Sequence, residues 1–190
     1  FLSADHGAAH VPAFLHEQKI PAGHIKPQLL TDTLNAGLKV KFGKENLVVT
    51  IMNYQVVLNT VLIDSFKLNK KEIKQWLIQN LLRRPGIANA VDIESVMLAP
   101  LNNKIKEMIV NGYYPKRSGD IQLLYAPQWI DGFEKGGTTH GVWHPYDAHI
   151  PLLWYGWNIK PGKGSHEVYI TDIAPTLAAL LKIQMPNGCT

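Results

Sequence analysis

The feature that most constrains the fold is the apolar run at residues 150–155, which contains no charged side chain. A nearly continuous apolar run is typical of a strand that is buried on both faces of a sheet. Such a sheet needs helices on its faces, and a helical pattern follows at residues 171–181, with Pro175 in the first turn. Together with a strand end at residues 1–4, these patterns predict an α/β fold.

The middle of the chain has a different pattern, in which strands pair locally. Residues 47–52 and 55–58 are strand-like and flank Asn53-Tyr54, which predicts a hairpin. We therefore expect a smaller α+β insert at residues 27–118 beside the main sheet. The other predicted elements are a helix from Pro27 to Leu38, a strand segment at 61–63, a helix between Asn69 and Pro85, a strand at 88–91, a helix at 101–110, a strand at 121–125, and loops at 8–23 and 136–141.

Composition excludes several other classes of protein. Hydrophobic residues make up 46% and charged residues 18% of the 190-residue chain, which is the balance of a globular domain. No stretch is long and apolar enough to span a bilayer, and Cys189, the only cysteine, excludes an internal disulfide and a cysteine zinc site. The net charge is +4. The densest group of basic residues is Lys67, Lys70, Lys71 and Lys74. We interpret this group as a solvated helix face rather than a nucleic-acid site.

The first candidate for chemistry is the sequence Asp5-His6-Gly7. Carboxylate and imidazole are ligands that zinc accepts when no thiolate is available. Adjacent residues of a regular strand point to opposite faces, but at a strand end the chain turns and both side chains can converge. On this evidence alone, a polar loop held by a structural hydrogen bond is the alternative.

A second candidate is the glycine-rich segment at residues 136–141, where His140 lies between small residues. Glycines allow the backbone to approach an ion or a phosphate closely. An ordinary flexible loop is the alternative for this segment. Taken together, the two segments favour a carboxylate and imidazole metal site.

These motifs resemble the alkaline phosphatase superfamily. The resemblance rests on residues 3–10 (SADHGAAH), 137–141 (GTTHG), 146–153 (YDAHIPLL) and 168–177 (VYITDIAPTL), which span the whole chain in the family order. The sequence is most similar to the phosphate-irrepressible bacterial alkaline phosphatases, which are related to the nucleotide pyrophosphatases/phosphodiesterases. The resemblance implies the C-terminal part of a three-layer α/β/α fold, with residues 1–190 belonging to one such domain.

The resemblance also implies roles for three residues. Asp5 and His6 would bind the zinc ion that also holds the nucleophile, and His140 would bind the second zinc ion. The family hydrolyses phosphate esters by a two-zinc mechanism with a threonine nucleophile. That threonine, the remaining metal ligands and the groups that contact phosphate are expected upstream of Phe1. We therefore expect this chain alone to bind zinc weakly and to be catalytically inactive.

The sequence also predicts the surroundings of several other residues. His149 is expected in the core or beside the ligands, His10 at the site rim and His144 in solvent. Asp147 is a candidate for orienting a ligand histidine, because carboxylates often support metal-bound imidazoles. Asp172 is expected at a helix start.

Several readings of the function remain open. Phosphate monoester hydrolysis is favoured, a phosphodiesterase of the same superfamily is the alternative, and a non-catalytic α/β module belongs to a different class. The resemblance implies a periplasmic or secreted protein. A chain that lacks strands of its parent sheet would expose a sheet edge and apolar surface, so self-association is a further expectation.

Overall fold

The computed structural model describes residues 1–132 and 136–188, and Cys189 lies outside them. The chain separates into two compact units. The main unit is Leu2–Leu153, and the terminal unit comprises Phe1 and the residues from Trp154 onward.

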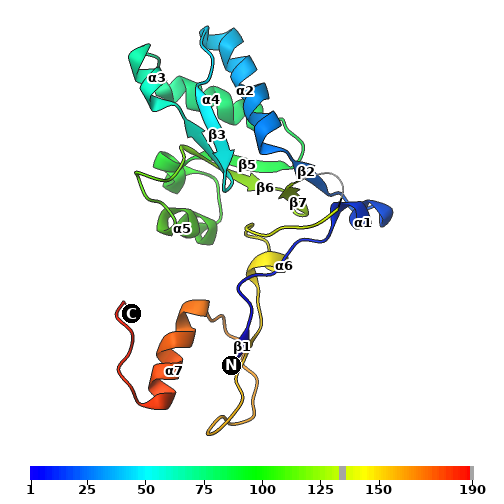
Figure 1. Cartoon of the computed structure of the whole chain (residues 1–190), viewed down its shortest axis with the longest axis vertical. Coiled ribbons are helices and arrows are strands. Elements are labelled where there is room, and N and C mark those ends of the chain that lie inside the picture. The colour runs from blue at the N-terminus through cyan, green and yellow to red at the C-terminus, as the bar shows by residue number, and fades with distance from the viewer. Residues whose placement is uncertain (133–135, 189–190) are drawn as a thin grey trace. The chain divides into compact units, whose positions relative to one another are not determined.

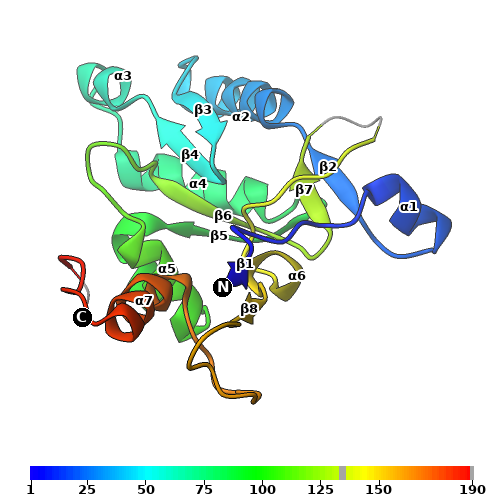
Figure 2. The same cartoon turned by 60° about the horizontal axis from the view of Figure 1, so that its bottom comes forward.

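A four-stranded antiparallel sheet organises the main unit, with the strand order β3-β4-β6-β5. Three of these strands, β3, β5 and β6, are labelled in Figure 1, and all four are labelled in Figure 2. Asn53 and Tyr54 join β3 to β4 with φ angles of 50° and 59°, which is the left-handed pair that a type I′ hairpin turn needs. This confirms the predicted hairpin. The strands are β3 (Val48–Met52), β4 (Gln55–Leu58), β5 (Ile87–Asp92) and β6 (Ile121–Tyr125).

Helices cover both faces of this sheet (Figure 2). On one face, α2 (Pro27–Phe42) and α4 (Lys70–Leu81) pack their leucines and isoleucines against Ile121 and Leu123 of β6. On the other face, the 3-10 helix η1 (Ile93–Leu98) and α5 (Asn103–Asn111) pack around Leu124. All five residues of β6 are therefore buried, although the sheet is antiparallel.

Several predicted elements are confirmed. The helix after Asn69 forms as α4, because the Asn69 side chain accepts the backbone N–H groups of Lys71 and Glu72. The strands at 88–91 and 121–125 and the helix at 101–110 also form, the last beginning at Asn103 after a cap by Asn102. Asp172 lies at a helix start, where its carboxylate accepts the N–H of Tyr169; the helices there are η2 (Ile170–Asp172) and α7 (Ile173–Leu181).

Other predictions are wrong. Residues 61–63 form part of the helix α3 (Thr60–Ser65), because Asn59 caps it by accepting the N–H of Leu62. The segment at 8–23 contains the short helix α1 (Pro12–Glu17), with a proline at its first position. It leads into β2 (Gly23–Ile25), which pairs in parallel with β7 (Trp129–Asp131).

The apolar run at 150–155 is the largest departure from expectation. Only Leu152–Leu153 forms a strand, β8, which pairs antiparallel with β1 (Leu2–Ser3). Leu153 is 56% and Tyr155 98% exposed, so burial on both faces is wrong for the part of the chain that the structure describes. The physical reason is that β8 pairs with β1 alone in a two-stranded sheet. Among the described residues, none belongs to a helix with the length and apolar character needed to span a membrane.

Candidate metal centre

Two loops that are far apart in the sequence lie together in the main unit. The loop after β1 and the loop around His140 are joined because the Ala9 N–H donates to the Thr139 carbonyl at 3.3 Å and the Thr138 hydroxyl donates to the Ala9 carbonyl. The imidazole rings of His6 and His140 consequently stack with centroids 3.4 Å apart and planes 9° from parallel. The structure thus brings together the histidines of the two predicted motifs.

Asp5 lies beside His6 in a geometry that suits one shared ion. Its Oδ2 is 3.6 Å from His6 Nε2, and its Oδ1 accepts the His6 backbone N–H at 3.0 Å. Zinc–ligand bonds of ~2.0–2.2 Å in a tetrahedron set neighbouring ligand atoms about 3.3 Å apart. The Asp5 side chain is 88% exposed and the His6 side chain 37% exposed, so both can be reached by an ion.

One nitrogen of His6 already has a partner. Its Nδ1 lies 2.6 Å from the Gly7 carbonyl, and we assign the proton to Nδ1 because a carbonyl can only accept. This tautomer leaves the lone pair of Nε2 available toward Asp5. Metal-binding histidines commonly donate their other N–H to a backbone carbonyl in this way.

The stacking also bears on the number of ions. Imidazole lone pairs lie in the plane of the ring, so rings only 9° from parallel do not aim at one common point. The donor set, with one carboxylate and two imidazoles, fits zinc.

Asp147 completes a cluster with the two histidines. One potential ligand atom from each of His6, His140 and Asp147 lies within 4.8 Å of the others. Asp147 belongs to the short helix α6 (Pro145–Ala148) and is only 3% exposed. Its Oδ2 accepts the backbone N–H groups of Gly141 at 2.6 Å and Val142 at 2.8 Å.

Tyr54 is a contact of the His140 loop that the motifs did not indicate. Its hydroxyl donates to the His140 carbonyl at 2.9 Å, and its ring meets Tyr125 edge to face. Burial and the nearby Asp131 carboxylate raise the pKa of Tyr54 to about 12. The phenol therefore keeps its proton, and can remain a donor, throughout moderately alkaline solution.

The remaining histidines do not join the cluster. His144 is half-buried, with Nε2 3.0 Å from the Tyr125 carbonyl, so its predicted exposure is wrong. His149 is exposed, so its predicted place in the core is wrong; the strand that was to bury it begins only at Leu152. His10 is exposed and lies near Phe14.

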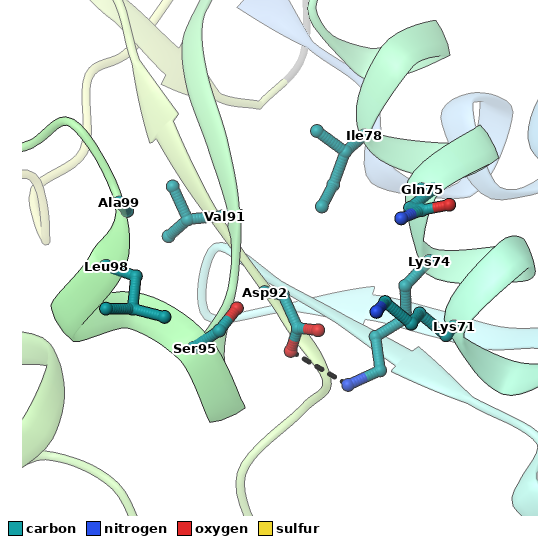
Figure 3. A pocket seen from close by; sticks show the side chains of 9 residues that line it. All are labelled: Lys71, Lys74, Gln75, Ile78, Val91, Asp92, Ser95, Leu98 and Ala99. Atoms are coloured by element: carbon teal, nitrogen blue, oxygen red, sulfur yellow. Dashed lines mark hydrogen bonds and ion pairs between the residues drawn. The ribbon is translucent and has the colours of Figure 1, made fainter.

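A pocket of about 290 Å³ between α4 and the β5–η1 segment offers a different candidate (Figure 3). Lys74 lines it but is 3% exposed, so its predicted place on a solvated face is wrong. Its Nζ donates to Asp92 Oδ1 at 2.8 Å and to Glu94 Oε2 at 2.6 Å. Because these carboxylates neutralise the Lys74 ammonium group, Lys74 belongs to a structural ion-pair network beside the pocket and is not a free cation in it.

The fold and the two-loop cluster define a mixed α/β protein with a carboxylate and imidazole site. No family model matches the chain. It is 43% identical over 188 residues to alkaline phosphatase PhoV of Synechococcus elongatus and 40% identical over 188 residues to alkaline phosphatase PafA of Elizabethkingia meningoseptica. It is also 45% identical over 189 residues to a Myroides odoratus protein named calcium-transporting ATPase.

Each of these alignments covers 99% of this chain and 34% of the relative. The solved structure of wild-type alkaline phosphatase PafA matches all of this chain with a TM-score of 0.90 at 39% identity, and the match covers 36% of that structure. The chain therefore belongs to the alkaline phosphatase family and has the corresponding part of its fold, as the sequence predicted. The chain spans about a third of the length of these relatives.

Proposed function

We propose that the protein containing this chain hydrolyses phosphate monoesters with two zinc ions, and that this chain contributes part of the metal centre. Asp5 and His6 bind one ion and His140 binds the other. The observation that carries the proposal is the stacked pair of His6 and His140 with Asp5 Oδ2 3.6 Å from His6 Nε2. The names of the PafA and PhoV relatives support the reaction class.

The residues of the chain have simple tasks in this proposal. His6 presents Nε2 because its Nδ1–H is held by the Gly7 carbonyl, and Asp5 supplies the negative charge that a dication needs. The Tyr54 hydroxyl donates a hydrogen bond to the His140 carbonyl and so fixes the main chain at this ligand. When bound, two zinc ions would neutralise the charge on the attacking and leaving oxygens of a phosphate ester.

The chain alone holds three of the ligands and no threonine nucleophile at a matching position. We therefore propose that it binds zinc weakly and does not turn over substrate unaided. Following the resemblance, we place the protein in the periplasm or outside the cell. A phosphodiesterase is the alternative activity, and a non-catalytic module is the alternative of a different class.

A zinc titration of the full 190-residue chain tests the metal assignment. We expect binding that weakens by about tenfold or more in Asp5→Ala and His140→Ala and is unchanged in His149→Ala, an exposed histidine outside the cluster. Equal binding by all four proteins would contradict the assignment and favour the non-catalytic module.

Activity is tested in a longer protein that includes this chain. An aryl phosphate monoester should be hydrolysed much faster than the matching diester, and Asp5→Ala should abolish both reactions. A preference for the diester would favour the alternative. Ordinary enzymatic turnover by the 190-residue chain with zinc would show that its predicted inactivity is wrong.

A further inference from the structure

We propose that Asp147 is a positioning residue that holds the loops carrying His6 and His140 in register before any metal binds. This inference rests on the proposed function for its purpose, but the contacts that support it belong to the protein alone. It differs from a ligand role, which the proximity of Asp147 to both histidines would otherwise suggest.

The side chain of Asp147 fixes the loop of His140. Its Oδ2 accepts two consecutive backbone N–H groups, from Gly141 at 2.6 Å and Val142 at 2.8 Å, directly after the histidine. The side chain is buried to 3% exposure, and hydrogen bonds from N–H groups to a buried carboxylate are strong. Losing this acceptor would leave two N–H groups of the loop without their partner.

The main chain of Asp147 fixes the loop of His6. Its carbonyl accepts the Gly7 N–H at 2.7 Å, one residue after the histidine. The contact is close enough that a Cβ atom on Gly7 would lie 2.1 Å from the Tyr146 carbonyl oxygen. One residue thus contacts both ligand loops, through its carboxylate on one side and its carbonyl on the other.

The helix α6 that carries Asp147 is itself anchored to the sheet. His144 Nε2 lies 3.0 Å from the carbonyl of Tyr125 in β6, and the Tyr146 hydroxyl accepts the N–H of Gln128 at 3.0 Å. Two residues that precede Asp147 therefore tie it to the core of the main unit. The Asp147 side chain is buried and its Oδ2 already accepts two N–H groups. We therefore assign this carboxylate to holding the loops rather than to binding an ion.

The first test needs no metal. In NMR spectra of the metal-free 190-residue chain, we expect nuclear Overhauser contacts between the rings of His6 and His140. These contacts should weaken in Asp147→Asn, which keeps the shape, and disappear in Asp147→Ala, with upfield shifts of the Gly141 and Val142 amide protons. Asp120→Asn is the matched control, because Asp120 also accepts a backbone N–H, from Leu58 at 2.8 Å, but contacts neither loop. Unchanged ring contacts in a folded Asp147→Ala chain would overturn the proposal.

The second test separates positioning from ligation. In a cobalt(II) titration, Asp147→Asn should weaken binding by about tenfold or more while the visible absorption spectrum at saturation keeps the wild-type shape. A spectrum altered as in His140→Ala would identify Asp147 as a ligand and overturn the inference. If the wild-type chain binds no cobalt, the zinc proposal for this chain fails, and the metal-free ring contacts alone decide the role of Asp147. If Asp147→Ala does not fold, the folded Asp147→Asn chain carries both tests.

Discussion

Gly7 lies where the loop of Asp5 and His6 touches the backbone of α6. A side chain there has no space, because its Cβ would meet the Tyr146 carbonyl oxygen at 2.1 Å. Gly7→Ala should therefore displace the loop, lower the free energy of unfolding by about 1–3 kcal/mol and weaken zinc binding. Gly162→Ala is the control, because a Cβ at Gly162 would meet nothing within 4 Å. Chemical denaturation and zinc titration measure the two effects, and equal behaviour of both variants would refute this account of Gly7.

At the scale of residues, the sequence named the histidines of the cluster and proposed that Asp147 orients a ligand histidine, but it indicated neither Tyr54 nor the backbone groups that Asp147 contacts. Asp5, His6 and His140 could be named as candidate ligands because their side-chain chemistry and glycine neighbours are visible in the sequence. The bonds of Asp147 and Tyr54 were harder to find, because their partners are backbone groups of Gly7, His140, Gly141 and Val142, which every sequence contains. Which of the polar residues meets such a group depends on the path of the whole chain.

At the scale of elements, Lys74 ties α4 to the β5–η1 segment. Although burial lowers the pKa of Lys74, hydrogen bonds to Asp92 and Glu94 raise it overall, and the hydrogen bond from Lys74 lowers the pKa of Glu94. The Lys74 contribution to stability is thus present below pH about 10.5 and lost as the pH rises through its raised pKa in the folded state. The Glu94 contribution is present above pH about 4.5 and lost as the pH falls through its lowered pKa.

Lys74→Met should therefore flatten the dependence of stability on pH at both ends. At neutral pH the substitution should lower the free energy of unfolding by about 1–3 kcal/mol. This is less than the loss expected on breaking a fully buried ion pair, because the side chains of Asp92 and Glu94 are 24% and 62% exposed. Denaturation across the pH range measures both effects. Lys71→Met, on the same helix, is the comparison, and a pH profile unchanged by Lys74→Met would count against the network.

The end of α4 offers a second prediction at this scale. Leu81 is fully buried and its neighbour Leu82 is 46% exposed. Leu81→Ala should lower the free energy of unfolding by about 2–5 kcal/mol, because it leaves a cavity under the sheet, while Leu82→Ala should cost less than about 0.5 kcal/mol. Urea denaturation compares the pair, and similar losses would mean that α4 does not pack as described.

Elements with a clear period were predicted well, and short ones were not. The helix after Asn69 and the hairpin at Asn53-Tyr54 have both an apolar period and a local cap or turn. By contrast, α1, α3 and α6 have only 6, 6 and 4 residues, too few to show a helical period against a strand or loop pattern. For residues 61–63, three apolar residues in a row suit either a strand or one helical turn, and the cap by Asn59 decides between them.

At the scale of the whole molecule, the two units differ in how much core they contain. The main unit holds two apolar clusters, whereas the only buried residue among the described part of the terminal unit is Ala178. Regions with few buried apolar contacts open at low free energy. Amide hydrogen exchange of the full chain should therefore be faster in α7 than in α4 or β6 by orders of magnitude. Equal protection would show that contacts other than the burial of Ala178 stabilise α7.

The α/β class and the family could be predicted because four motifs occur in order along the whole chain. The burial of residues 150–155 could not be predicted correctly from the sequence, because a strand is buried on both faces only when neighbouring strands and covering helices are present. The apolar pattern of a strand shows that it is suited to a buried position, but not whether neighbouring strands are there to bury it. In this structure β8 pairs with β1 alone. The boundary of the insert at 27–118 stays a prediction.

Exposed apolar side chains lead to a last prediction, that the chain associates with itself. In the terminal unit Leu181 is 66% and Ile183 61% exposed, and both lie close together in the sequence at the end of α7. Neighbouring exposed apolar groups gain free energy when they are removed from water, so copies of the chain should meet through this segment. Sedimentation velocity should then give a coefficient that rises with concentration.

The double change Leu181→Lys and Ile183→Lys should shift the chain toward monomer, because two ammonium groups would have to be desolvated in the contact. Val40→Lys is the matched control: Val40 is 89% exposed on α2 of the main unit, so a new lysine there adds charge without altering the α7 segment. If the control shifts the chain as much as the double variant, net charge rather than this surface governs association. A wild-type coefficient that is independent of concentration would rule out self-association altogether, and the exposed side chains would then be tolerated in water by a monomer.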